Sequence, residues 1–134
     1  KIANFIAEKK IPVSIGPSLV GFEKSELRHI TFETPAILWK AGVKISIQSD
    51  LFTRLRYFQI LPCMAAKSGL PVEEALRAVT IYPAQILGID ELTGSIEKGK
   101  DADNVVWSDH PIKNFYAELQ ITFVNGQIAY QFTK

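Results

Sequence analysis

The sequence is poor in cysteine, in histidine and in excess charge of either sign. Its 134 residues include one cysteine, Cys63, so no disulfide can form within the chain, and a reducing cytoplasm is the expected compartment. The 15 basic and 14 acidic side chains nearly cancel, which excludes the strong positive field that attracts nucleic acid or anionic lipid. No apolar run approaches the roughly 20 residues that cross a bilayer. Neither a nucleic acid nor a membrane is therefore an expected partner.

The chain also lacks an initiator methionine, because it opens with Lys1 and its one methionine is Met64. We therefore expect that a leader or tag has been removed or that the chain is a piece of a longer polypeptide. Hydrophobic residues make up 47% of the sequence, which is enough for a core without disulfide or metal staples. This composition indicates a folded globular protein and excludes intrinsic disorder.

The first two-thirds of the chain alternate between strand and helix signals. The β-branched runs at 11–15 and 43–47 predict two buried strands. Between them, Thr34 followed by Pro35 has the pattern of an N-cap with proline at the first helical position, and Gly42 indicates the end of that helix. Strand, helix and strand with short connections indicate a parallel βαβ unit. Because two parallel strands cannot form a stable sheet alone, we expect missing neighbours and exposed edges on the Val13 and Ile45 strands.

Three further helices are expected after Asp50. The first is a long apolar stretch with a kink at Pro62, the second begins at Pro71, and the third covers 83–87 and stops at Gly88. From Gly94 onward the period changes from helical to alternating.

The alternating segment predicts strands at 94–97 and 104–107. The change of period divides the chain into an α/β part, residues 1–90, and an antiparallel β part, residues 91–134.

The clearest local signal is Asn125-Gly126, which predicts a two-residue hairpin turn of type I′. Pairing across this turn places Phe123 opposite Ile128 and Ile121 opposite Tyr130. One face of the hairpin would then be apolar throughout.

Asp50 is the strongest candidate for a chemical role. It follows the strand at 43–47, and catalytic groups of α/β enzymes gather at the carboxyl ends of such strands. A carboxylate in this position can bind a hard metal or take a proton from a water molecule. The alternative is that Ser49 or Asp50 caps the helix that follows. The sequence position is compatible with both interpretations.

The remaining candidates are weaker. His29 and His110 belong to no metal-binding motif, so a closed metal site within this chain is not expected. His29 is a candidate substrate contact, because it follows the first strand in the loop on the strand-end side of the βαβ unit, and Ser14 and Pro17 are the other local candidates. His110 is interpreted as a solvated loop residue. Cys63 lies in an apolar helical stripe and is interpreted as a core residue.

Two segments resemble the C-terminal region of metal-dependent amidohydrolases, the superfamily of imidazolonepropionase and dihydroorotase. Residues 74–89 match the pattern A-x-x-x-x-T-x-x-P-A-x-x-L-G, and residues 94–106 match G-S-I-x-x-G-x-x-A-D-x-V-V. Residues 124–126 resemble the terminal hairpin of the family. The helix at 34–38 that leads into Asp50 looks most like the imidazolonepropionase-related branch.

The resemblance implies an α/β fold made of the last two β/α units of a TIM-like (β/α)8 barrel, followed by strands of a small antiparallel β-sandwich. A complete barrel takes about 250 residues, so this chain could hold only the seventh and eighth strands. The implied parent enzyme is a metal-dependent hydrolase of non-peptide C–N bonds in small cyclic amides or amidines. Asp50 would bind the divalent metal, expected to be zinc, and move the proton between water and the leaving nitrogen.

The family's His-x-His after the first strand and its later metal-binding residues have no counterpart in this chain. We therefore expect that the isolated chain neither holds the metal tightly nor turns over substrate. The alternative function is a non-catalytic structural or binding module with an amidohydrolase-like tail, completed by self-association into a homo-oligomer. The presence of His-x-His upstream would distinguish the two.

Overall fold

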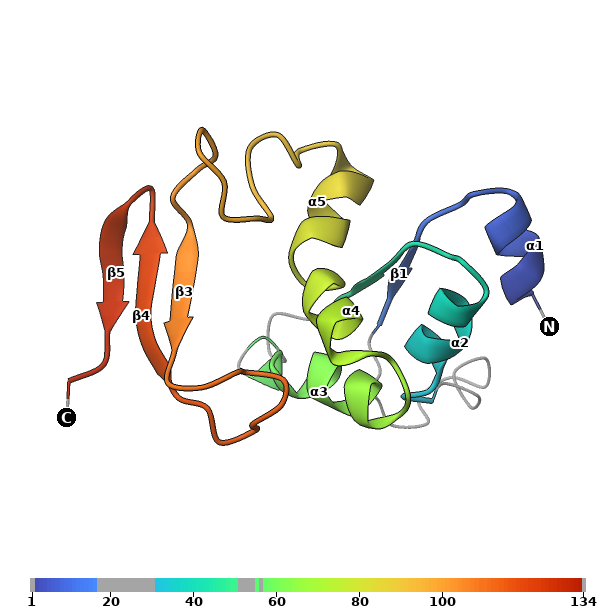
Figure 1. Ribbon diagram of the computed structural model, residues 1–134, viewed down its shortest axis with the longest axis horizontal. Coiled ribbons are helices and arrows are strands. Elements are labelled where there is room, and N and C mark those ends of the chain that lie inside the picture. The colour runs from blue at the N-terminus through green and yellow to red at the C-terminus, as the bar shows by residue number, and fades with distance from the viewer. Residues whose placement is uncertain (1, 17–30, 51–54, 56, 134) are drawn as a thin grey trace.

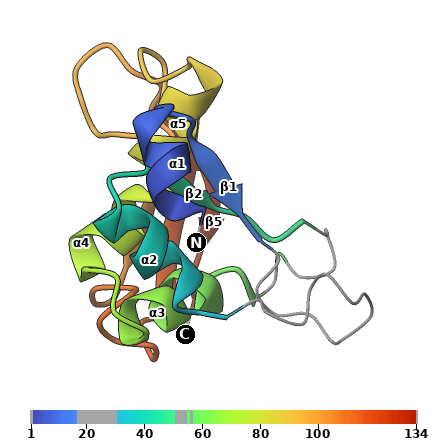
Figure 2. The same cartoon turned by 90° about the vertical axis from the view of Figure 1, so that its right-hand side faces the viewer.

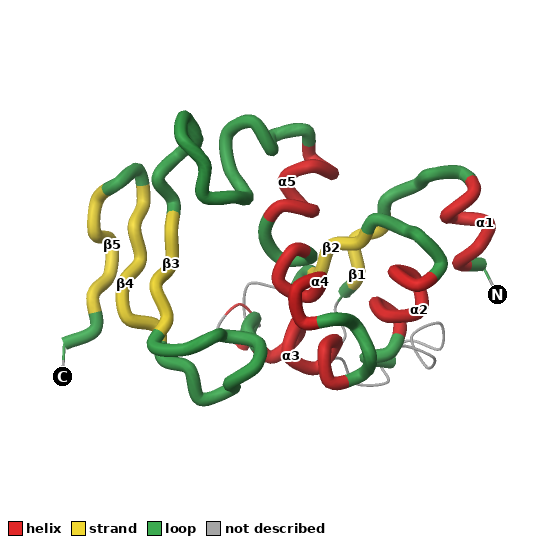
Figure 3. Tube along the Cα trace, in the orientation of Figure 1, coloured by secondary structure: helices red, strands yellow, loops and turns green. Residues whose placement is uncertain are grey.

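The computed structural model of the chain describes residues 2–16, 31–50, 55 and 57–133 (Figure 1). An α/β part comes first and an antiparallel sheet follows, as Figure 3 shows by colour. The regular elements of the described residues are α1 (Ala3–Glu8), β1 (Val13–Ile15), α2 (Thr34–Lys40), β2 (Ile45–Ile47), α3 (Ile60–Lys67), α4 (Val72–Arg77), α5 (Ile81–Leu87), β3 (Asn104–Trp107), β4 (Leu119–Val124) and β5 (Gln127–Gln131).

The expected βαβ unit is confirmed. Strands β1 and β2 are parallel, with Val13 opposite Ile45 and Ile15 opposite Ile47, and α2 lies between them in the chain. β2 is also hydrogen-bonded to the segment after α4: the Ile47 N–H donates to the Ala78 carbonyl at 2.9 Å.

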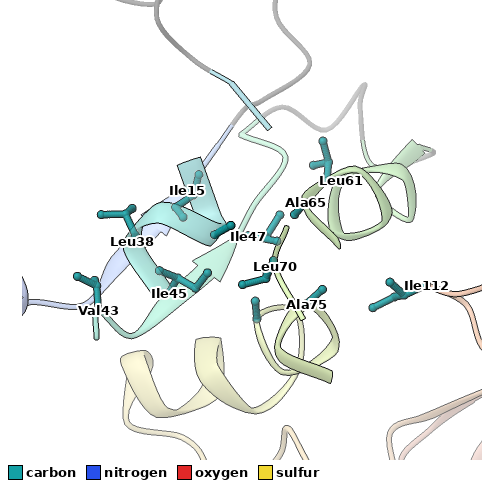
Figure 4. Packing of buried hydrophobic residues seen from close by; sticks show 12 residues of the cluster. Ile15, Leu38, Val43, Ile45, Ile47, Leu61, Ala65, Leu70, Ala75 and Ile112 are labelled. Carbon is teal, nitrogen blue, oxygen red and sulfur yellow. The ribbon is translucent and has the colours of Figure 1, made fainter. Parts of the chain in front are cut away.

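The core surrounds β2 (Figure 4). Ile45 is completely buried, and each of its strand neighbours is buried as well. The apolar side chains that enclose it come from α2, α3, α4 and nearby connections, and they include Leu38, Leu61, Ala65, Leu70, Ala75 and Ile112. The expected exposed edge of the Ile45 strand is covered in part, since Ile47 N–H bonds to the Ala78 carbonyl, whereas the exposed edge of the Val13 strand stays a prediction.

Several helix boundaries differ from expectation, and α5 begins at Ile81 rather than at Pro83. Thr34 is the first residue of α2, and Glu33 precedes it as the N-cap without a side-chain bond. Pro62 is the third residue of α3, where the backbone N–H would have no partner within the helix, so proline removes no hydrogen bond and no kink is required. The stop at Gly88 is confirmed by its left-handed φ of 70°.

Strands β3, β4 and β5 form an antiparallel sheet in that order. Asn125 and Gly126 have φ values of 52° and 74°, as a type I′ turn requires, and Phe123 pairs with Ile128 as expected. The predicted partner of Ile121 is wrong, because a register shift between Thr122 and Phe123 pairs Ile121 with Gln131. The extra residue of a β-bulge displaces every later pair by one position.

The expected strand at 94–97 is also wrong, because these residues pair with no strand in the described part of the chain. Ile96 is 87% exposed. Local polar bonds shape the segment instead, since Ser95 Oγ contacts both Glu97 Oε1 and the Lys100 ammonium. An alternation of apolar and polar side chains is not sufficient to form a strand when no neighbouring strand is available for backbone hydrogen bonds.

The three-stranded sheet lies at the far end of the molecule from α1 (Figure 1), while α1 and α2 lie close together (Figure 2). Both faces of this sheet carry exposed apolar side chains, which include Val105, Val106, Val124, Ile128 and Tyr130. Among the described helices, none is long and apolar enough to cross a membrane.

Candidate active site

Asp50 lies three residues beyond the last residue of β2. Its side chain is exposed, and its backbone has a φ of 64°. This left-handed conformation costs roughly 1 kcal/mol for most residues, although aspartate and asparagine adopt it more readily than others. Backbone strain of this kind is concentrated at functional sites, so the local geometry of Asp50 is consistent with a role beyond packing.

Gly16 brings the carboxyl ends of the two parallel strands together. Gln48 N–H donates to the Ile15 carbonyl at 2.9 Å, and a Cβ on Gly16 would overlap the carbonyl oxygen of Gln48. Only glycine allows this close backbone approach. The sequence signal was a glycine directly after a strand, which can mark such an approach, but the close contact itself was not predicted.

The strand end beside Asp50 is polar. Ser46 and Ser49 are the buried polar residues of this region, at 5% and 8% exposure. Ser14 pairs with Ser46 in the parallel register and is itself exposed. Ser14 therefore lies on the strand pair that carries Asp50, and its expected substrate contact stays a prediction.

The alternative capping role of Asp50 does not apply to α3, since that helix begins at Ile60 with Gln59 as its N-cap. His29 and Pro17, two further candidates for substrate contact, lie outside the described residues. Their relation to Asp50 therefore stays a prediction.

His110 and Cys63 make hydrogen bonds to the backbone that stabilise the loop after β3. His110 Nδ1 accepts hydrogen bonds from the backbone N–H groups of Ile112 and Lys113, at 3.2 and 3.4 Å. The Cys63 thiol donates to the Pro111 carbonyl at 3.4 Å, and burial raises the pKa of this thiol. A raised pKa disfavours the nucleophilic thiolate, so Cys63 is a packing residue that holds the loop after β3.

A catalytic zinc site needs three protein ligands in addition to water. Within residues 2–16, 31–50, 55 and 57–133, no three His, Cys, Asp or Glu side chains come together in a way that could hold a metal ion. Asp50 can supply one carboxylate. The described residues thus do not complete a metal site by themselves.

A separate polar cluster ties three helices together near the start of β2. Glu74 of α4 accepts hydrogen bonds from Trp39 Nε1 of α2 at 3.1 Å and from the Tyr82 hydroxyl of α5 at 2.6 Å, and Arg77 pairs with its other oxygen at 3.0 Å. Burial, followed by the bond to Glu74, raises the pKa of Tyr82. This cluster was not predicted, because its fourth member, Trp39, lies 35 positions from Glu74 in the sequence.

Residues 3–132 match the model of the amidohydrolase family. The chain belongs to the amidohydrolase family. It is 37% identical over 95 residues to imidazolonepropionase of Acinetobacter baumannii strain AB0057. The aligned region covers 67% of this chain and 24% of that protein. It is 38% identical over 64 residues to N-acetylglucosamine-6-phosphate deacetylase of Rattus norvegicus, covering 48% of this chain and 14% of that enzyme.

The solved structure of an amidohydrolase from Thermotoga maritima MSB8 superposes with a TM-score of 0.91 and 39% sequence identity, covering 98% of this chain and 34% of that one. The chain thus spans about a quarter of the imidazolonepropionase and a third of the solved amidohydrolase. The family resemblance carried by the two motif segments is confirmed, and so is the α/β class of the fold.

The structure also explains what the amidohydrolase-like motifs do in this chain. Gly94 lies against α5, where a Cβ would come within 2.8 Å of the Ala84 Cβ, and Asp103 Oδ1 accepts a bond from Asn125 N–H. Both motif residues therefore serve packing and turn geometry.

Proposed function

We propose that this chain is the C-terminal part of a metal-dependent hydrolase that cleaves non-peptide C–N bonds in cyclic amides or amidines. β1 and β2 would be the seventh and eighth strands of its (β/α)8 barrel within residues 1–90, and β3–β5 would belong to a small β-sandwich formed by residues 91–134. The likeness to imidazolonepropionase supports this substrate class, and imidazolonepropionate is the first substrate to test.

The observation that carries the proposal is the placement of Asp50. It is an exposed carboxylate in a left-handed backbone conformation, just beyond the carboxyl end of a buried parallel strand. In (β/α) barrels this is the end at which catalytic residues gather. His29, which follows the first strand in the sequence, is proposed as a substrate contact.

Asp50 would serve as a base and then as an acid. Its carboxylate would accept the proton of the attacking water and return it to the leaving nitrogen, which avoids expelling a strongly basic anion. A divalent ion, proposed to be zinc, would supply Lewis acidity and a water of lowered pKa when bound. Asp50 would provide one of its ligands, and the others would come from polypeptide outside this chain.

The decisive experiment is Asp50→Asn in the longer polypeptide that contains this segment. Loss of a positioned general acid–base lowers kcat by about 10²- to 10⁴-fold, and asparagine keeps the left-handed backbone acceptable. Asp101→Asn is the matched control, because Asp101 is an exposed acid in the turn before β3. Equal kcat values for the two variants would disprove the role of Asp50.

The isolated 134-residue chain is expected to be inactive and to hold no zinc tightly, because Asp50 supplies a single ligand. Equilibrium dialysis against zinc and an assay with imidazolonepropionate test both points. Hydrolysis by the pure chain that disappears in Asp50→Asn would contradict the expectation of inactivity.

The second candidate function is a non-catalytic module. The exposed apolar side chains on both faces of the β3–β5 sheet favour it, since such surfaces commonly mark contact with another polypeptide. A coding sequence without His-x-His upstream of this segment would support the module, whereas its presence would support the hydrolase.

A further inference from the structure

A groove crosses the strand ends opposite to Asp50. It consists of two adjoining clefts of about 370 and 200 Å³, which share Gly42, Val43 and Lys44 as lining residues. Gly42–Lys44 lead directly into β2, and Ile11 and Pro12 lead into β1. In Figure 1 these connections lie between α5 and α1. The groove is therefore separated from the candidate active site by the full length of both strands.

The walls of the groove include several apolar and aromatic side chains. The larger cleft is lined by Ala7, Ile11, Pro12, Val43 and Ile86, and the smaller by Trp39 and Tyr82. Ligand sites in proteins typically combine such walls with a few placed polar groups, in volumes of about 300–1,000 Å³. The larger cleft alone reaches this size.

The charge of the groove is positive. Lys10 and Lys44 line it, and none of the described residues that line either cleft is acidic. The carboxylate of Glu74 lies behind Trp39 and Tyr82, and both of these side chains donate hydrogen bonds to it. Glu74 is paired with Arg77 at 3.0 Å, so its charge is balanced by that guanidinium rather than by the two lysines.

Lys44 is held through its side chain, and Lys10 has a constrained backbone. Lys44 Nζ donates to Gln85 Oε1 at 2.9 Å, which uses one of the three donors of an ammonium group. Lys10 has a φ of 53° at the end of α1, where Lys10 N–H bonds to the Ala7 carbonyl and Ile11 N–H to the Ile6 carbonyl. Glycine usually fills this position, so a lysine here has an unfavourable backbone conformation, and it lines the larger cleft.

We propose that this groove binds a small organic anion whose apolar or aromatic body lies along the groove and whose anionic group lies beside Lys10 and Lys44. The apolar walls match the body, and the two ammonium groups match a carboxylate or phosphate. The site is independent of the proposed hydrolase, since it needs no residue of the strand end that carries Asp50.

The probe is phenylbutyrate, with the uncharged phenylbutyramide as its matched counterpart, titrated into the isotope-labelled 134-residue chain. We expect amide NMR shifts at Gly42, Val43 and Lys44 and at the indole N–H of Trp39. The acid is expected to bind more tightly than the amide, and added salt should reduce that difference through screening. Equal affinities for acid and amide, or no shifts at Gly42–Lys44, would overturn the proposal.

Substitutions of the lysines test which ammonium groups bind the anion. Lys44→Gln is expected to weaken binding of the acid roughly threefold, the scale of an exposed ion pair, without affecting the amide. Lys113→Gln, on the loop after β3, is the control and should change neither. Lys10→Gly should weaken acid binding while raising the stability of the chain, because glycine accepts the left-handed backbone. If Lys44→Gln and Lys113→Gln bind the acid as wild type does, the two-lysine site is wrong.

Discussion

Asp103 Oδ1 accepts a hydrogen bond from the backbone N–H of Asn125 at 2.8 Å, across 22 positions of sequence. Asp103 directly precedes β3, and Asn125 opens the turn between β4 and β5. Beside this bond, Gly126 N–H donates to the Ala102 carbonyl at 3.1 Å. The Ala-Asp pair of the family motif thus holds the tip of the hairpin against the entry to the sheet.

Replacing Asp103 with alanine is expected to destabilise the chain by about 1 kcal/mol, the usual net value of one hydrogen bond. Asp103→Asn keeps an acceptor oxygen and should cost less. Asp101→Ala is the control. Asp101 is also exposed, and its backbone N–H donates to the Leu92 carbonyl, a bond that is kept in the alanine variant. Urea unfolding measures all three, and equal losses for Asp103→Ala and Asp101→Ala would contradict this role.

Gly94→Ala is expected to destabilise the chain more than Gly99→Ala does. The two glycines have similar φ values, 94° and 99°, so the backbone strain of an alanine lowers the free energy of unfolding by a similar amount in both variants. A Cβ at Gly94 would in addition overlap Ala84 and Ile81, whereas one at Gly99 meets nothing within 4 Å. Overpacking of this kind costs about 1–3 kcal/mol. The difference between their thermal unfolding free energies isolates the contact between Gly94 and α5.

Asp50→Gly should raise the stability of the isolated chain, because glycine removes the cost of a φ of 64°, a gain of up to about 1 kcal/mol. The same change should abolish activity in the longer enzyme. Asp50→Ala removes the same carboxylate but keeps a Cβ, so it should not be stabilising. An Asp50→Gly chain less stable than wild type would show that the carboxylate itself supports the fold.

Stability is expected to fall at alkaline pH through Tyr82. Burial first, and then the bond to Glu74, raises the pKa of Tyr82 above its ordinary value of 10.0. The unfolded chain loses this proton at lower pH than the folded chain. The contribution is therefore complete below pH 10.0 and is lost as the pH rises through the raised pKa.

Tyr82→Phe removes this titration and leaves the other alkaline groups in place. Urea midpoints of both proteins, measured on either side of the ordinary tyrosine pKa, should converge as the pH rises. A constant difference between them would show that ionisation of Tyr82 has no effect on stability.

Self-association through the β3–β5 sheet is expected to depend on Ile128, which is 57% exposed and pairs with Phe123. Ile128→Lys should lower the concentration-dependent mass seen in sedimentation. Gln127→Lys adds the same charge at a neighbouring exposed position and removes no apolar surface. If both variants dissociate equally, charge repulsion rather than loss of apolar contact explains the effect.

Most patterns confined to a few neighbouring residues were predicted correctly, although the N-cap at Thr34 and the kink at Pro62 were not. The runs at 11–15 and 43–47 contain β1 and β2, Asn125-Gly126 forms the expected turn, and Gly88 ends α5. Asp50 was singled out because a strand end is visible in sequence. These features depend on local backbone preferences, which the residues themselves carry.

Failures arose wherever the outcome depended on a distant partner. Residues 94–97 alternate like a strand but have no strand partner among the described residues, and the bulge that pairs Ile121 with Gln131 has no sequence signature.

By itself the sequence determined the family, through its two motif segments, together with the βαβ unit and the acid, Asp50, that follows its second strand. Tertiary structure alone decided that Gly16 meets Gln48, that Trp39 and Tyr82 share Glu74, and that Lys10 and Lys44 line one groove. The physical reason is that these residues are far apart in the sequence. Contacts between residues tens of positions apart form only when packing of the core around Ile45 brings their elements together.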